Sequence, residues 1–195
     1  MKKLFLLFLF VIIFLGCNHT IGINIPKLKE DVSRVDTSGT YNLSFNELIE
    51  LLKEIEPNKN IEVDDKVREF KQDGKVRDYY KRIMFNSHEI RGYFIDEKLI
   101  SVAVYSRFGI SKTLDNSKEF ETTLEIDSAI LNGFKRQVLI INNVLNSSNT
   151  KKEMVKFLKD NIKKEIRVNQ SEKVGDSTIY LYRDNNSVVI EFMAK

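Results

Sequence analysis

Side chains suited to catalysis are scarce in this sequence. It has one cysteine, Cys17, and two histidines, His19 and His88. A Ser-His-Asp triad would depend on His88, which lies in the stretch NSHE, a pattern typical of an exposed turn, and no G-x-S-x-G motif accompanies it. The sequence also lacks the clustered His and Cys of zinc sites and the closely spaced Gly of phosphate loops. We therefore expect no enzyme, no cofactor and no bound metal.

Carboxylates are the remaining candidates for catalysis. Two acidic pairs stand out, Asp64-Asp65 and Asp96-Glu97. Neighbouring acids of this kind favour a helix cap and a hairpin loop, respectively. A glycoside hydrolase built on two carboxylates from distant parts of the chain stays an open alternative, because such a pair leaves no local motif.

The single cysteine lies where an apolar run ends. Met1, Lys2 and Lys3 supply positive charge, and residues 4–15 are uniformly apolar. This order is typical of a secretory signal peptide. A membrane-spanning helix needs about 20 apolar residues, and this run supplies roughly a dozen. We expect residues 1–16 to be removed as a signal peptide.

The residues before Cys17, Phe14-Leu15-Gly16, resemble the lipobox of bacterial lipoproteins. Gly16 and Cys17 match that motif, whereas Phe14 and Leu15 stand where Leu and then Ala or Ser are usual. The resemblance implies that the Cys17 thiol receives diacylglycerol, that cleavage precedes Cys17, and that its amine is acylated, as with palmitate. At about 0.8 kcal/mol per buried methylene, two or three acyl chains bind a membrane durably. The alternatives for Cys17 are a buried free thiol and a cysteine left inside an uncleaved helix.

A chain rich in Lys, Asn, Ile and Phe adds a likeness to spirochaete surface lipoproteins. The resemblance implies a lipid-anchored protein of the bacterial outer membrane, displayed on the cell surface. It also implies a non-catalytic interaction module with a host-facing role such as adhesion or immune interaction. A structural or assembly lipoprotein that faces the periplasm is the alternative. Asn18 does not decide between the two locations.

The net charge of the processed chain limits the kinds of partner that it can bind. Of 31 basic residues, Lys2 and Lys3 leave with the signal peptide, and 29 remain against 28 acidic residues. The processed chain is therefore nearly neutral, which argues against a nucleic-acid partner. Residues 17–40 mix Gly, Ser, Thr, Asn and charge, and predict a tether with a reach of about 25 Å. Residues 41–195 are long enough for one globular domain.

Three helices are predicted. Ser44 and Glu47 form a capping box before an apolar stripe that ends at Pro57. The spacing of Val63, Val67 and Phe70 predicts a short helix over residues 65–72. A second capping box, Thr150 with Glu153, predicts a helix to about residue 166. Its expected buried residues are Met154, Phe157, Leu158 and Ile162.

Strands are predicted in three groups. Residues 76–85, 89–95 and 99–108 alternate with period two, and a three-residue loop at 96–98 would pair Phe94 with Ile100, Gly92 with Val102 and Ile90 with Val104. Asn132-Gly133 predicts a tight turn between strands at 122–131 and 134–145. An Asn185-Asn186 turn would pair Leu181 with Ile190 and Ile179 with Phe192. The expected fold class is α+β, with an antiparallel sheet of about seven strands, two main helices and one short helix.

Two surfaces are candidates for binding a protein or an anionic glycan. Arg91, Tyr93, Tyr105 and Arg107, with Tyr79 or Tyr80, share the face opposite the core, and Tyr and Arg are enriched at binding hot spots. Ordinary decoration of a solvated sheet is the alternative. On the last helix, Lys152, Lys156, Lys159 and Lys163 recur at spacings of four, three and four. These lysines either bind an anionic partner or form a solvated face, with Asp160 pairing Lys156 and Lys164.

Overall fold

The computed structural model describes residues 35–72, 75–85, 88–107, 128–146, 150–162, 166, 168–184 and 187–194. The predicted signal peptide, Cys17 and most of the predicted tether lie outside this part of the chain. Within it, no helix is long and apolar enough to cross a membrane.

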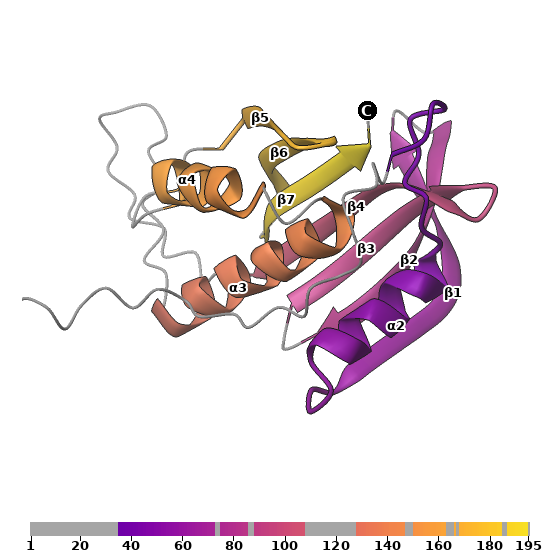
Figure 1. The fold of residues 1–195 in the computed structure, drawn as a ribbon. Coiled ribbons are helices and arrows are strands. Elements are labelled where there is room, and N and C mark those ends of the chain that lie inside the picture. The colour runs from indigo at the N-terminus through magenta and orange to yellow at the C-terminus, as the bar shows by residue number, and fades with distance from the viewer. Residues whose placement is uncertain are drawn as a thin grey trace, which may run out of the picture.

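The described residues form one antiparallel sheet with helices packed on one face (Figure 1). Seven strands lie in the order β1-β2-β3-β4-β7-β6-β5. They are β1 (Ile61–Gln72), β2 (Lys75–Phe85), β3 (His88–Ile95), β4 (Lys98–Arg107), β5 (Gln170–Val174), β6 (Ser177–Asp184) and β7 (Ser187–Ala194). The helices are α2 (Phe45–Ile55), α3 (Ser128–Leu145) and α4 (Lys151–Asn161). The predicted fold class, α+β with about seven antiparallel strands, is confirmed.

The first predicted helix is confirmed together with its cap. The Glu47 amide donates to Ser44 Oγ at 3.3 Å, and the Ser44 amide donates to Glu47 Oε2 at 2.7 Å. This reciprocal capping box satisfies backbone donors that the first turn of a helix leaves free. Helix α2 then ends at Ile55, shortly before Pro57.

The prediction of a short helix over residues 65–72 is wrong, because these residues belong to β1. Strand β1 pairs with β2 along its length, with register shifts between Asp64 and Arg68 and between Phe70 and Lys71. The first shift inserts extra residues between Val63 and Phe70, so the apolar spacing imitates a helix although the backbone is extended. Pairing with β2 satisfies the backbone groups along one side of β1 and outweighs the local pattern.

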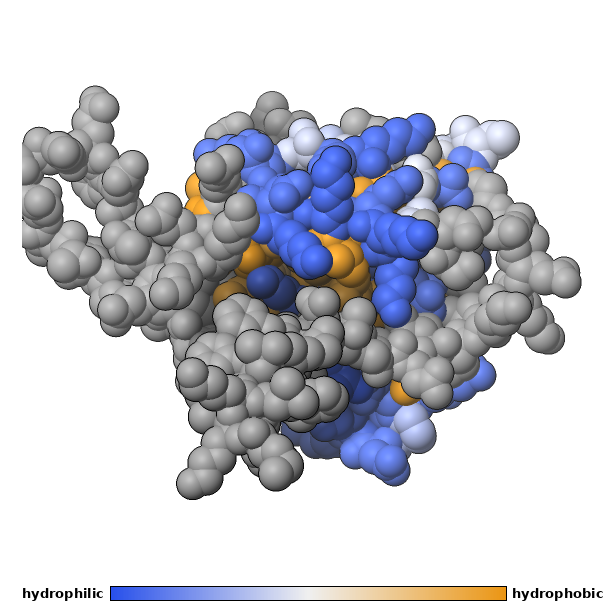
Figure 2. Space-filling model, turned by 60° about the vertical axis from the view of Figure 1, so that its left-hand side comes forward, coloured by the Kyte–Doolittle hydropathy of each residue, from blue (hydrophilic) through white to orange (hydrophobic). Residues whose placement is uncertain are grey.

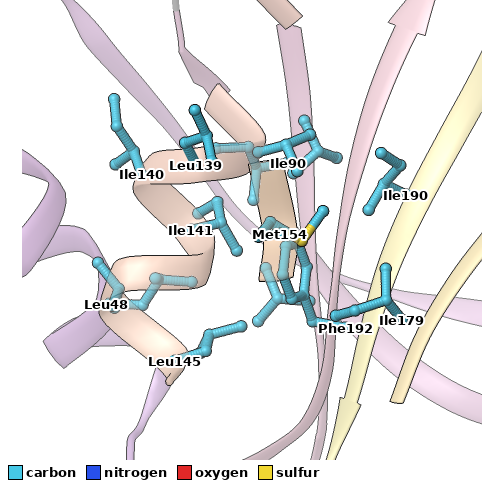
Figure 3. Close-up of a cluster of buried hydrophobic side chains, with 14 of the residues drawn as sticks. Leu48, Ile90, Leu139, Ile140, Ile141, Leu145, Met154, Ile179, Ile190 and Phe192 are labelled. Atoms are coloured by element: carbon cyan, nitrogen blue, oxygen red, sulfur yellow. The ribbon is translucent and has the colours of Figure 1, made fainter. Parts of the chain in front are cut away.

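The predicted turn at Asn132-Gly133 is also wrong, since both residues lie inside α3. The β-branched residues that favoured a strand, Val138, Ile140, Ile141 and Val144, are all fully buried in this helix. The helix is buried on several sides, so most of its positions after Phe134 contact the core, and β propensity yields to that packing. Figure 3 shows Ile141 and Leu145 of α3 beside Leu48 and Met154 of the neighbouring helices.

The last predicted helix is confirmed, but it ends earlier than predicted. Helix α4 ends at Asn161 rather than residue 166, and its predicted buried residues Met154, Phe157, Leu158 and Ile162 are at most 3% exposed. The predicted capping box at Thr150 is wrong. Thr150 makes no side-chain cap bond, because its Oγ1 instead accepts a hydrogen bond from Asn142 Nδ2 of α3 at 3.0 Å.

The turn between β3 and β4 is one residue shorter than predicted. Asp96 and Glu97 form it, with φ of 47° and 68°, and Phe94 pairs with Leu99 rather than Ile100. A register shift after Tyr93 absorbs the difference. The predicted pairs Gly92 with Val102 and Ile90 with Val104 are therefore confirmed.

The predicted carboxyl-terminal pairing is confirmed, with Leu181 opposite Ile190 and Ile179 opposite Phe192. The turn residues 185–186 lie outside the described part. The number of strands matches the prediction, but two of the seven strands are not the ones predicted. Strands β1 and β5 stand at the two edges of the sheet, in place of the two strands predicted around Asn132-Gly133.

The last residues of the predicted tether contact the domain. Val35 forms a bridge with Tyr41, and the Asp36 carboxylate accepts hydrogen bonds from Ser38, Thr40 and Lys98. The Lys98 Nζ lies 2.8 Å from Asp36 Oδ2. The chain therefore enters the domain beside the β3–β4 turn.

Candidate binding surfaces

The structure brings most of the predicted Tyr and Arg residues together on the outer face, which we define as the face of the sheet opposite α2, α3 and α4. Five residues form the Tyr–Arg cluster there. They are Tyr80 of β2, Arg91 and Tyr93 of β3, Tyr105 of β4 and Tyr182 of β6. Strand alternation places these side chains on one face, and buried Ala103 and Val189 pack among them.

Arg91 is the centre of this cluster. Its guanidinium carbon lies 3.8 Å from the centroid of the Tyr105 ring and 5.1 Å from that of Tyr80. Its Nε donates to Glu89 Oε1 at 2.6 Å, and Nη1 lies 3.8 Å from Asp184 Oδ2. Burial opposes the charge of Arg91, but Tyr105 and Glu89 raise the pKa of the guanidinium above its usual value. Arg91 is therefore a fixed cation whose charge is largely balanced within the domain.

The tyrosine hydroxyl groups also have partners. Tyr93 and Tyr105 share a hydrogen bond of 3.0 Å, and the Tyr182 hydroxyl donates to Glu191 Oε2 at 3.0 Å. Ser101 donates to the other oxygen of Glu191 at 2.7 Å. Burial raises the pKa of Tyr93, Tyr105 and Tyr182, so these phenols stay protonated at neutral pH. The cluster is ordered before any partner arrives.

The prediction placed Arg107, and either Tyr79 or Tyr80, near this cluster; Tyr80 joins it, whereas Arg107 and Tyr79 do not. Arg107 is exposed at the end of β4, and no hydrogen bond, ion pair or ring contact links it to the cluster in the described residues. Tyr79 is 46% exposed, and its alternation with Tyr80 puts it on the opposite face. Tyr80 is the neighbour that stacks, with its ring 5.3 Å from that of Tyr93.

Sequence reasoning missed two aromatic residues of this face. The Phe70 ring meets the Tyr93 ring edge-on at 6.0 Å, but Phe70 was assigned to a helix. Tyr182 alternates with the core residues Ile179 and Leu181, so the period-two pattern already indicated its face. Its closeness to Tyr105 depends on β7 lying between β4 and β6, which no local pattern predicts.

Exposed apolar side chains flank the Tyr–Arg cluster. Phe70 is 39% exposed, Met84 41% and Ile95 54%. All three lie on the outer face. Met84 is an even number of residues from Tyr80 in β2, Ile95 is an even number from Tyr93 in β3, and the ring of Phe70 contacts that of Tyr93. We call these three residues the apolar rim.

A second surface is the outward side of α4. Lys152, Lys156 and Lys159, here called the lysine stripe, are exposed, whereas Met154, Phe157 and Leu158 are buried. In the described part of the chain none of the three forms an ion pair, and the expected pair between Lys156 and Asp160 is absent. Figure 2 shows mainly hydrophilic residues on the upper part of the described surface in that view. Lys163 lies outside the described residues.

His88 differs from its prediction as an exposed turn residue. It begins β3, is 4% exposed, and lies 6.0 Å from the Phe134 ring of α3. Its Nδ1 is buried and has no hydrogen-bond partner among the residues that the structure describes. Burial lowers the pKa of His88, so the imidazole is neutral at physiological pH. Gly133 permits this packing, because a Cβ there would lie 3.1 Å from His88 Nε2.

The two acidic pairs singled out in the sequence lie in different structural settings. Asp64 and Asp65 belong to β1, so the helix cap expected there is wrong. Asp64 Oδ2 accepts hydrogen bonds from Arg68 at 2.6 Å and Arg82 at 2.7 Å, which hold the pKa of that carboxyl well below its usual range. Asp96 and Glu97 form the β3–β4 turn. Among the residues that the structure describes, no group of three or more His, Cys, Asp or Glu side chains is arranged to hold a metal ion.

These two surfaces, the outer face and the lysine stripe, are the candidate sites that the described residues offer. Comparison with protein-family models, with curated proteins and with solved structures finds no match for this chain.

Proposed function

We propose that this chain is a lipoprotein of the bacterial outer membrane, anchored through Cys17, whose domain is a non-catalytic module that binds a protein partner at the cell surface. The observation that carries the proposal is the apolar rim, Phe70, Met84 and Ile95, exposed around the Tyr–Arg cluster on one face of the sheet. Aromatic residues and arginine dominate the energy of protein interfaces, and they act best when surrounding contacts exclude water.

The arrangement of the outer face suits protein binding. Glu89 fixes Arg91, and burial together with a shared hydrogen bond fixes Tyr93 and Tyr105, so little side-chain freedom is lost on association. The apolar rim supplies surface that gains free energy when a partner removes it from water. Glu89 offsets the charge of Arg91, and Asp184 adds a second carboxylate 3.8 Å away, so the cluster carries no excess of positive charge that would attract a polyanion. The outer face therefore favours a protein rather than a polyanion.

The anchor is supported by the sequence. Cys17 follows a short apolar run with positive charge before it, and resembles the lipidated cysteine of lipoproteins. Metabolic labelling with palmitate tests it: the native protein takes up label and the Cys17→Ser variant does not. Equal labelling of the two proteins would remove the anchor. Protease treatment of intact cells then locates the domain, since rapid loss supports surface display and full protection supports a periplasm-facing assembly role.

Cross-linking in intact cells tests the binding surface. We expect a cross-linked protein adduct with the native chain, and its loss in the variant Phe70→Ser/Met84→Ser/Ile95→Ser. The control is Tyr79→Ser/Ile130→Ser, which removes side chains that are 46% and 40% exposed away from the outer face. Loss of the adduct in both variants, or in neither, would contradict binding through the outer face.

A further inference from the structure

The lysine stripe is a compact cationic surface. At about 100° per residue, Lys152, Lys156 and Lys159 fall within a sector of about 60° of the helix, on the side away from the buried Met154 and Phe157. The acidic residues of α4, Glu153 and Asp160, border the stripe, about 60° and 40° around the helix from Lys156, but neither pairs with a lysine of the stripe in the described residues. The charge of the stripe is thus available to an external anion.

The start of α4, the helix that carries the lysine stripe, lies near the point where the chain enters the domain. Thr150, just before α4, is hydrogen-bonded to Asn142. Further side-chain hydrogen bonds connect Asn142 to Asn146, Asn146 to Ser177 and Ser177 to Tyr41. Helix α4 therefore begins at the end of the sheet where the amino-terminal segment joins. A chain from Cys17 to Val35 spans at most about 60 Å, several times the length of α4, which is about 16 Å. An anchor at Cys17 can therefore bring α4 to the same bilayer.

The two candidate surfaces face in opposite directions. Helix α4 packs on the helix-covered face of the sheet, and its lysines point away from that core. The Tyr–Arg cluster lies on the other face. A flat anionic layer against α4 would leave the outer face directed away from it.

We propose that the lysine stripe docks the domain on the anionic lipid surface of the membrane that holds its anchor, and so presents the outer face to the protein partner. The choice of membrane and the orientation of the domain rest on the proposed function, whereas the affinity of the lysine stripe for anionic lipid does not. A lysine near an anionic bilayer contributes about fivefold to binding, so three lysines contribute about a hundredfold. Such attraction weakens as salt shortens the screening length.

The test uses the processed chain from residue 17 with Cys17→Ser, so that no acyl chain contributes to binding. Co-sedimentation is measured with vesicles of phosphatidylcholine alone and of phosphatidylcholine mixed with phosphatidylglycerol. We expect binding to the mixed vesicles only, weakened about a hundredfold by Lys152→Gln/Lys156→Gln/Lys159→Gln. The matched control, Lys59→Gln/Lys66→Gln/Lys71→Gln, removes the same charge from exposed positions near β1 and should bind within a few fold of the parent chain.

Three results would overturn the docking. The first is equal binding to both kinds of vesicle, and the second is an equal loss in the two lysine variants, which would indicate diffuse charge. The third is tight binding of a soluble sulfated polysaccharide by the stripe with no binding to anionic vesicles, which would assign it to a glycan. Because this assay uses unlipidated protein, failure to find lipid on Cys17 leaves its result unchanged.

Discussion

The hydroxyl of Tyr41 lies 2.7 Å from Ser177 Oγ, although 136 residues separate them. This bond is one end of a buried chain of polar side chains. Ser177 Oγ donates to Asn146 Oδ1 at 2.8 Å, Asn146 Nδ2 donates to Asn142 Oδ1 at 3.1 Å, and Asn142 continues to Thr150. All five residues are at most 4% exposed. The chain of bonds joins the entry segment, α3, the start of α4 and β6.

Replacing Ser177 by Ala should destabilise the domain by about 1–3 kcal/mol, because it leaves the buried Tyr41 hydroxyl and Asn146 oxygen without a partner. Urea unfolding followed by circular dichroism measures the change. The control is Ser171→Ala on β5, where the side chain is exposed and a change below about 0.5 kcal/mol is expected. Equal effects of the two substitutions would show that the buried network contributes little.

Gly92→Ala should also destabilise the domain, by about 1–3 kcal/mol, because the core there is already full. A Cβ at position 92 would lie 2.6 Å from Phe45 Cδ2 and 2.9 Å from Leu99 Cδ2. Thermal unfolding measures the loss. Pairing Gly92→Ala with Phe45→Leu removes the closest contact, so the double variant should be more stable than the sum of the two single effects predicts. Simple additivity would contradict this packing.

Arg91 and Glu89 should behave as a coupled pair. Their side chains are 20% and 12% exposed, so Arg91→Met leaves a largely buried carboxylate unpaired and should cost about 2–4 kcal/mol. The double variant Arg91→Met/Glu89→Gln removes that unpaired charge and should recover part of the loss. A double-mutant cycle in urea measures the coupling energy. A coupling energy near zero would mean that Tyr80 and Tyr105, rather than Glu89, hold Arg91.

Stability should fall as the pH drops below about 6.5, the ordinary pKa of histidine. Burial lowers the pKa of His88 in the folded domain, so the unfolded chain takes up a proton first and acid favours unfolding. Above that pH both states are neutral and this penalty is absent. The difference in unfolding free energy between the parent protein and His88→Gln should therefore change with pH between about 6.5 and the folded pKa. His19→Ala should leave the slope unchanged, and a flat difference curve for His88→Gln would contradict the burial of a neutral imidazole.

Strong local signals predicted the fold class. The Ser44–Glu47 capping box, the alternating segments of β2, β3 and β4, and the pairing of β6 with β7 each depend on neighbours in sequence, and each is confirmed. Two segments have conflicting local signals, and the secondary structure predicted for each is wrong. In α3, β-branched residues and Asn132-Gly133 favoured strands, whereas burial among α2, α4 and the sheet favours a helix. In β1, a register shift gave extended residues a helical spacing.

Composition and period-two alternation are local properties, so the amino-acid sequence is enough to show the scarcity of catalytic side chains, the lipoprotein-like resemblance at Cys17, and the grouping of Arg91, Tyr93 and Tyr105 on one face. The order of the strands in the sheet, in contrast, is known only from the folded chain. The position of β7 between β4 and β6 brings Tyr182 to Tyr105, and the packing of α3 buries His88 beneath Gly133. Such contacts come from the burial of apolar surface between distant segments, which no window of the sequence contains.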